Sequence, residues 1–370
     1  MLILLYVFDS LRPDFLGCYG DMGAHTPHLD AFAASASLYR NAYAPAPWSK
    51  ASGAALLTGR LPRAVQMHTL LEALPPGVPT LAEQMERVGF RTIAVSANPF
   101  ISRDFELLRG FTNTVEGFRP EVFPGEPLRF HPNHFRRVEQ RLSAPADALV
   151  VPRSAALHRA LLEQLPPAEP AFALCWSMDT HAPFVVRGEE SLFGNPLDRI
   201  VPAADEEWLR HGITLADVTR LYRDMIAYND AQFGLLMAEL HRRRLWEDAL
   251  IVVAGDHGEA LGAHGVLGHT HGLWEEQVRI PLLVKHPGQT ESREVGGVCS
   301  LLDVWPTLAA WLPTGTPDPG WGAALPVEGE CSPRPLLIEG RDGWALRDAH
   351  WKLLSSPTGS APLLFNIETD

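Results

Sequence analysis

The feature that most constrains the fold is a set of short apolar runs, each followed at once by acidic or imidazole side chains. Residues 2–8 are all apolar and lead directly into Asp9. Residues 171–178 and 249–254 are similar runs that end just before further aspartates and histidines. Strands that are apolar on both faces are typical of a parallel sheet covered by helices. These runs therefore predict the central strands of such a sheet.

Longer stretches with the spacing of helices alternate with these runs. We expect helices at residues 28–37, 81–88, 154–165, 215–243 and 301–312, and further strands at 91–96 and 278–284. This alternation predicts an α/β fold with a central, mostly parallel sheet and helices on both faces. After a Pro- and Gly-rich segment, short runs at 336–339 and 350–354 predict a small antiparallel subdomain. We place a catalytic domain at residues 1–325 and a C-terminal subdomain at 326–370.

Composition excludes several classes of protein. The chain has 370 residues and a formal net charge of −13, the wrong sign for general attraction to nucleic acid or an anionic membrane. No apolar stretch approaches the roughly 20 residues that cross a bilayer, and the N-terminus lacks the basic region of a signal peptide. We therefore expect a cytoplasmic protein without a nucleic-acid or membrane partner. The four cysteines form no Cys-x-x-Cys pair, which predicts free thiols. No oligomeric state follows from the sequence.

Polar side chains follow three of the expected strands. Asp9 follows the first, Asp179 and His181 the second, and Asp256 and His257 the third. Because the carboxyl ends of parallel strands meet at one edge, where α/β proteins bind ligands, these side chains should converge. Any one such aspartate is more often a helix cap or turn residue. Their shared placement favours a metal or catalytic site.

A glycine-rich segment continues from the last of these strands. It holds four histidines within fifteen residues, His257, His264, His269 and His271. Glycines between them let the backbone approach a ligand closely. We take His269 and His271 as functional candidates, whereas His264 fits an incidental loop histidine equally well.

A candidate nucleophile lies at the expected start of another helix. Ser49 follows a Pro-rich approach and precedes a run of small residues. A helix N-terminus stabilises anions through its dipole and free N–H groups. Taken alone, Ser49 is an ordinary helix cap, and Ser52 competes with it for either role.

Several blocks of sequence together carry a family resemblance. They are residues 7–20 with 26–30, residues 49–60, residues 179–183, and residues 255–259 with 274–281, followed by the weaker blocks 302–307 and 364–367. In this order they resemble the sulfatase family of the alkaline phosphatase superfamily. The resemblance implies an alkaline phosphatase-like sandwich fold.

The resemblance also implies a metal-dependent site. Asp9, Asp256 and His257 resemble metal ligands, and Ser49 stands where the family has its nucleophile, next to the metal. The ion would be a divalent cation. Ca and Mg suit the carboxylates, whereas Mn and Zn suit the imidazole.

The remaining histidines have implied roles at the substrate. His181 and His269 resemble the residues that hold the ester oxygens or protonate the leaving group. His271 would replace His269 if the alignment across the glycines slips by two positions. A second ion held by Asp179, His181 and His269 is an open alternative.

Departures from the family pattern bear on the substrate. Gly53 stands where the pattern for conversion to formylglycine has an arginine, Ser10 replaces a second aspartate, and Asn98 lies where another family block is replaced. We therefore expect Ser49 to remain unmodified.

The predicted function is metal-dependent hydrolysis of a small-molecule anionic ester through a covalent Ser49 intermediate, with phosphate favoured over sulfate. A phosphoryl transferase and a non-catalytic anion-binding protein remain alternatives, and we expect residues 111–170 and 185–212 to set specificity.

Overall fold

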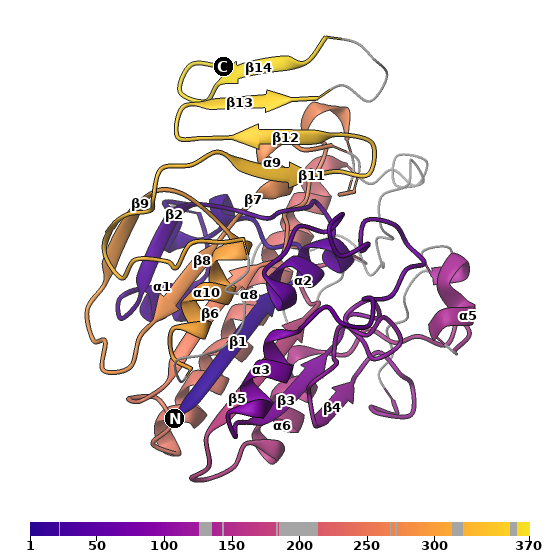
Figure 1. Ribbon diagram of the computed structural model, residues 1–370, viewed down its shortest axis with the longest axis vertical. Coiled ribbons are helices and arrows are strands. Elements are labelled where there is room, and N and C mark those ends of the chain that lie inside the picture. Colours follow the sequence, from indigo (N-terminus) through magenta and orange to yellow (C-terminus); the bar gives the residue numbers. More distant parts are fainter. Residues whose placement is uncertain are drawn as a thin grey trace.

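The computed structural model describes residues 1–21, 23–125, 135–142, 144–182, 184, 214–266, 268–270, 272–312, 321–355 and 361–370. These residues form a ten-stranded sheet with the order β10-β9-β2-β8-β6-β1-β5-β3-β4, and β7 pairs with β2 (Figure 1). The strands are β1 (Leu2–Phe8), β2 (Ser37–Tyr43), β3 (Arg91–Ser96), β4 (Asn113–Glu116), β5 (Ala171–Ser177), β6 (Leu250–Gly255), β7 (Arg279–Ile280), β8 (Leu282–Lys285), β9 (Arg293–Ser300) and β10 (Gly329–Glu330). Only β7 and β8 pair antiparallel with their neighbours in this sheet, so the predicted mostly parallel sheet is confirmed.

Helices cover the sheet on both faces (Figure 1). The described helices of the chain are α1 (Pro27–Ala33), α2 (Ser49–Thr58), α3 (Leu81–Arg87), α5 (Glu139–Leu142), α6 (Ser154–Gln164), α8 (Leu215–Arg242), α9 (Glu275–Val278) and α10 (Val304–Ala309), of which α5 and α9 lie away from the faces of this sheet. α8 packs against α1 and α6, whereas α2 packs against α3 and α10. Within the described ranges, no helix combines the length and apolarity needed to span a membrane.

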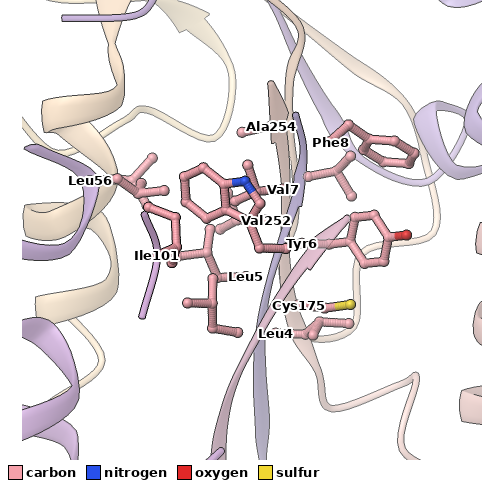
Figure 2. Packing of buried hydrophobic residues seen from close by; sticks show 14 of the residues in the cluster. Leu4, Leu5, Tyr6, Val7, Phe8, Leu56, Ile101, Cys175, Val252 and Ala254 are labelled. Atoms are coloured by element: carbon pink, nitrogen blue, oxygen red, sulfur yellow. The ribbon is translucent and has the colours of Figure 1, made fainter. Parts of the chain in front are cut away.

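The core is built around β1, the strand between β6 and β5. All seven of its side chains are buried. Successive side chains of a strand point to opposite faces. Figure 2 shows Leu5 on the side of Leu56 and Ile101, with Tyr6 and Phe8 on the other side. Packing on both faces explains why this run carries no polar residue.

A second, four-stranded antiparallel sheet lies at the C-terminus. It consists of β11 (Leu336–Glu339), β12 (Trp344–Arg347), β13 (Trp351–Leu354) and β14 (Leu363–Asn366). Figure 1 shows it beyond the carboxyl end of β1, on the side where α2 lies. The predicted antiparallel C-terminal sheet is therefore confirmed.

Three expected elements differ from the structure. The single strand expected at residues 278–284 is wrong, because α9 ends at Val278 and Pro281 separates β7 from β8. The helix expected at residues 28–37 ends early, and Ser37 already begins β2. The helix expected at residues 301–312 opens with a 3-10 turn and continues as α10. The four cysteines are free thiols, as expected.

Candidate active site

Asp9 lies at the carboxyl end of β1 and is fully buried. Its Oδ2 accepts hydrogen bonds from Asn98 Nδ2 at 2.6 Å and from Trp176 Nε1 at 2.8 Å. The next residue, Ser10, has a φ of 60°, so the chain turns sharply after the strand. These contacts hold the Asp9 carboxylate in one orientation at the edge of the sheet.

Ser49 is the first helical residue of α2, after the cap residue Trp48. Its Oγ lies 3.2 Å from Asp9 Oδ2 and 3.1 Å from His257 Nε2. The helix can come this close to the sheet because Gly53 carries no side chain. A Cβ on Gly53 would stand 2.5 Å from Ile101 Cδ1. The hydroxyl is thus aimed at the carboxyl ends of β1 and β6.

Asp256 and His257 follow β6 and are both fully buried. Asp256 Oδ1 accepts hydrogen bonds from the backbone N–H groups of Ser10, at 3.0 Å, and His257, at 2.8 Å. His257 Nδ1 lies 2.9 Å from Gly258 O, which places the ring proton on Nδ1. Nε2 therefore presents its lone pair toward Ser49, the arrangement of a metal-binding imidazole.

The charges of this cluster fit a divalent cation. Ligand atoms of Asp9, Asp256 and His257 all lie within 4.8 Å of one another. Asp256 Oδ2 is buried and accepts no hydrogen bond from the part of the chain that the structure describes. Burial together with the charge of Asp9 raises the pKa of Asp256 well above its usual value. Burial also opposes ionisation of Asp9, but nearby imidazoles and the Trp176 and Asn98 hydrogen bonds lower its pKa. A cation would neutralise both carboxylates and satisfy Oδ2.

Two further histidines flank the cluster. The ring of His269 lies 4.3 Å from that of His257 and 5.0 Å from that of His181, between centroids. Burial disfavours the charged form of His269, but Glu259 Oε2 lies 3.1 Å from its Nδ1 and raises its pKa. Burial lowers the pKa of His181. The pair therefore combines an imidazole that favours the protonated form with one that favours the neutral form.

Other candidates lie outside this group. Asp179 Oδ2 accepts a hydrogen bond from Ser154 N at 2.8 Å, at the start of α6. His264 stacks on Trp274 with the ring centroids 4.0 Å apart. Ser52 Oγ donates to Asp256 O at 2.6 Å. His271 lies outside the described residues. The structure thus brings together Asp9, Ser49, Asp256, His257, His181 and His269.

Three residues of the site were not predicted from sequence. Asn98 follows β3, so the rule applied to the other strand ends would have found it. Trp176 lies within β5, where a buried indole is indistinguishable from an ordinary core residue. Glu259 is buried beside His269, and only the fold reveals that contact.

A comparison with protein families shows which family this chain belongs to. A family model described as Sulfatase matches residues 2–314. The chain belongs to the sulfatase family. The predicted resemblance is thus confirmed, with the matched region reaching from β1 past α10.

Individual relatives support this placement. Iduronate 2-sulfatase of Mus musculus is 24% identical over 360 residues, covering 85% of this chain and 64% of the relative. Choline-sulfatase of Rhizobium meliloti (strain 1021) is 25% identical over 322 residues, covering 77% of this chain and 62% of the relative. The chain thus spans less than two thirds of the length of these curated relatives.

A solved structure confirms the fold of this sulfatase-family chain. Phosphonate monoester hydrolase of Agrobacterium radiobacter matches with a TM-score of 0.70 and 20% identity, covering 100% of this chain and 89% of that chain. At this identity, the likeness concerns the fold alone.

Proposed function

We propose that this protein is a metal-dependent hydrolase of a phosphate or sulfate ester, with Ser49 as nucleophile and a phosphate ester preferred. One observation carries the proposal: Ser49 Oγ lies 3.2 Å from Asp9 Oδ2 and 3.1 Å from His257 Nε2. A hydroxyl so close to a buried cation site suits nucleophilic attack on an anionic ester. Membership of the sulfatase family supports it. The phosphate preference rests on Gly53, which replaces the arginine of the formylglycine pattern.

The reaction follows from the positions of the side chains. Asp9, Asp256 and His257 would hold the divalent cation, which would lower the pKa of the Ser49 hydroxyl and neutralise developing charge. The Ser49 hydroxyl, which points its proton toward Asp9 Oδ2, loses that proton to solvent. Its Oγ then forms a bond to phosphorus or sulfur as the bond to the leaving oxygen breaks. His269 holds the proton that this oxygen takes up, because Glu259 favours the protonated ring. Attack by water on the Ser49 ester then releases the anion, with His269 acting as base.

The test combines metal loading with variants of the two serines. Metal-free protein is loaded separately with Ca, Mg, Mn and Zn and assayed with an aryl phosphate, a phosphodiester and an aryl sulfate. We expect turnover that a chelator abolishes, and a loss of at least about a thousandfold in Ser49→Ala. Mass spectrometry of acid-quenched protein should find the phosphoryl or sulfuryl group on the Ser49 peptide, also in Ser52→Ala. Full turnover by Ser49→Ala would overturn the assignment of the nucleophile.

The same experiment separates the two alternatives. Transfer of the group to added glycerol or ethanolamine, faster than transfer to water, would favour a transferase. Anion binding without turnover in any metal form would favour a binding protein. The intact mass of the Ser49 peptide also shows whether the serine has been converted to formylglycine.

A further inference from the structure

A cleft lies between the glycine-rich segment after His269 and the C-terminal sheet. Its volume is about 330 Å³. One wall contains Thr270 and residues 272–274, and the other contains the turn between β11 and β12, at residues 340–343. Leu354 and Ser355 near the end of β13, and Leu363 at the start of β14, complete the described lining. Figure 1 shows this sheet on the side of the molecule where α2 begins.

The cleft adjoins the candidate active site through both walls. Thr270 directly follows His269, and its N–H donates to Pro47 O at 3.0 Å, two residues before Ser49. On the other wall, the N–H of Glu339 donates to Pro45 O at 2.8 Å. The short loop before Ser49, which contains Pro45 and Pro47, is therefore linked to each wall of the cleft by one backbone hydrogen bond.

The lining is apolar over most of its extent. Leu273, Trp274, Leu354 and Leu363 contribute side chains, and glycines contribute backbone. The hydroxyl of Ser355 already accepts a hydrogen bond from the N–H of Trp344 at 2.6 Å. An apolar alcohol would gain from burial against this lining, whereas a polyhydroxy alcohol would find few polar side chains beyond Thr270, Arg341 and Asp342.

Two further features of the walls narrow the class of alcohol. The Trp274 ring is held by stacking against His264 and by an edge contact with Phe365, 5.8 Å between centroids. A fixed aromatic wall suits a planar ligand. Arg341 and Asp342 are adjacent in this turn and carry opposite charges, so the described lining has no net charge to select an ionic alcohol.

We propose that this cleft binds the alcohol half of the ester and selects an uncharged apolar one, aryl before alkyl, over a sugar. The inference rests on the proposed function, because it names the substrate class of the same site. It also places a specificity-determining surface in the C-terminal sheet, beyond residues 111–170 and 185–212.

Two neighbouring leucines provide the test and its control. Leu363 lies in the cleft opposite Leu354, its partner across β13 and β14. Leu364 is the next residue, so its side chain points to the other face of the sheet. The two are 53% and 59% exposed, so an aspartate at either position should be tolerated by the fold.

The first measurement is the ratio of kcat/KM for 2-naphthyl phosphate to that for methyl phosphate, with the corresponding sulfate pair run in parallel. We expect Leu363→Asp to lower the ratio at least tenfold, mainly through KM for the naphthyl ester. Leu364→Asp should keep the ratio within twofold of the original. An equal ratio in the two variants would overturn the proposal.

A second measurement does not depend on turnover. The affinity for free 2-naphthol, followed by calorimetry, should fall at least tenfold in Leu363→Asp and stay within twofold in Leu364→Asp. The naphthol should also bind more tightly than glucose to the original protein. Equal naphthol binding by both variants would overturn the proposed role of the cleft, even if the esters are hydrolysed. If none of the esters is hydrolysed, the proposed function is wrong. The naphthol titration would still show whether the cleft binds an aryl alcohol.

Discussion

Glu259 and His269 show how one buried carboxylate tunes a neighbouring base. Glu259 is 1% exposed, and its Oε2 lies 3.1 Å from His269 Nδ1. This contact fixes the orientation of the imidazole and stabilises its charged form against the cost of burial. Glu259 is therefore a positioning residue that keeps a proton available at the ring.

Replacing this carboxylate should move the pH dependence of the reaction. In Glu259→Gln the pKa of His269 falls, so the protonated ring is lost at lower pH and the alkaline limb of the kcat profile shifts downward. We expect kcat at its optimum to drop about tenfold or more. Glu276→Gln, beside His264 and not His269, is the matched control. An unchanged alkaline limb in Glu259→Gln would remove Glu259 from this role.

His158, outside the proposed metal site, shows the effect of burial without a neighbouring carboxylate to oppose it. Its Nε2 lies 2.8 Å from Tyr6 Oη, and burial lowers its pKa to about 3. Between this value and the usual 6.5, the unfolded chain binds a proton that the folded chain does not. The stability contribution is therefore complete above pH 6.5 and decreases as the pH falls toward 3.

Chemical unfolding of the metal-free protein at a series of pH values tests this linkage. Relative to His158→Gln, the original protein should lose up to about 1.4 kcal/mol of unfolding free energy per pH unit below pH 6.5. Parallel pH dependence of the two proteins would show that His158 does not titrate differently on folding.

The residues of the site differ in how readily the sequence predicts them. Asp9, Asp256 and His257 were predicted to converge because each follows an apolar run, and the carboxyl ends of these strands meet at one edge. Trp176 was not predicted, since its indole N–H bonds to Asp9 only after β5 pairs beside β1. The approach of Ser49 to this edge came from the family resemblance rather than from periodicity.

At the scale of elements, the packing of α2 depends on Gly53. All of its residues are buried, from Ser49 to Thr58. A Cβ on Gly53 would lie 2.5 Å from Ile101 Cδ1 and 3.1 Å from Trp176 Cη2. Since Trp176 also bonds to Asp9, the packing of this helix and the orientation of a proposed ligand are linked.

Gly53→Ala should therefore destabilise the fold, even though it adds only one methyl group. We expect overpacking to lower the free energy of unfolding by about 1–3 kcal/mol, measured by chemical denaturation. Gly23→Ala is the control, because a Cβ there has no neighbour nearer than 3.4 Å, and it should stay within about 0.5 kcal/mol. Equal stability of both variants would contradict the tight contact.

The strands with predicted bounds have a more continuous apolar pattern than those that were missed. The bounds of β1, β3 and β11 match the predicted runs. β2 and β9 were not predicted, because polar residues and glycines such as Arg40, Asn41 and Gly296 interrupt their apolar pattern. Both strands are partly exposed, so the burial that forces an apolar sequence is incomplete there.

At the scale of the whole molecule, an ion cluster connects the two sheets. Glu275 in α9 accepts hydrogen bonds from Tyr43 Oη at 2.9 Å, in the main sheet, and from Lys352 Nζ at 2.7 Å, in the C-terminal sheet. Arg347 Nε donates to Tyr43 Oη at 3.0 Å. Lys352 and Arg347 are 3% and 2% exposed, so their charges depend on Glu275.

Glu275→Gln should weaken the attachment of the C-terminal sheet. Two buried cations then lose their counter-charge, and we expect a loss of about 3 kcal/mol in unfolding free energy. Hydrogen exchange should accelerate in β11–β14 before the main sheet. Glu294→Gln, which breaks the exposed pair with Arg40, should cost less than about 1 kcal/mol. Equal costs would show that the cluster does not hold the sheets together.

The central claim is that Asp9, Asp256 and His257 hold a divalent cation beside Ser49. The most direct measurement is anomalous diffraction from crystals loaded with Mn or Zn, for the original protein and for Asp256→Asn. The account predicts one strong peak within coordination distance of these three side chains and next to Ser49 Oγ, lost or greatly weakened in the variant. A peak elsewhere, or the same peak in Asp256→Asn, would contradict it.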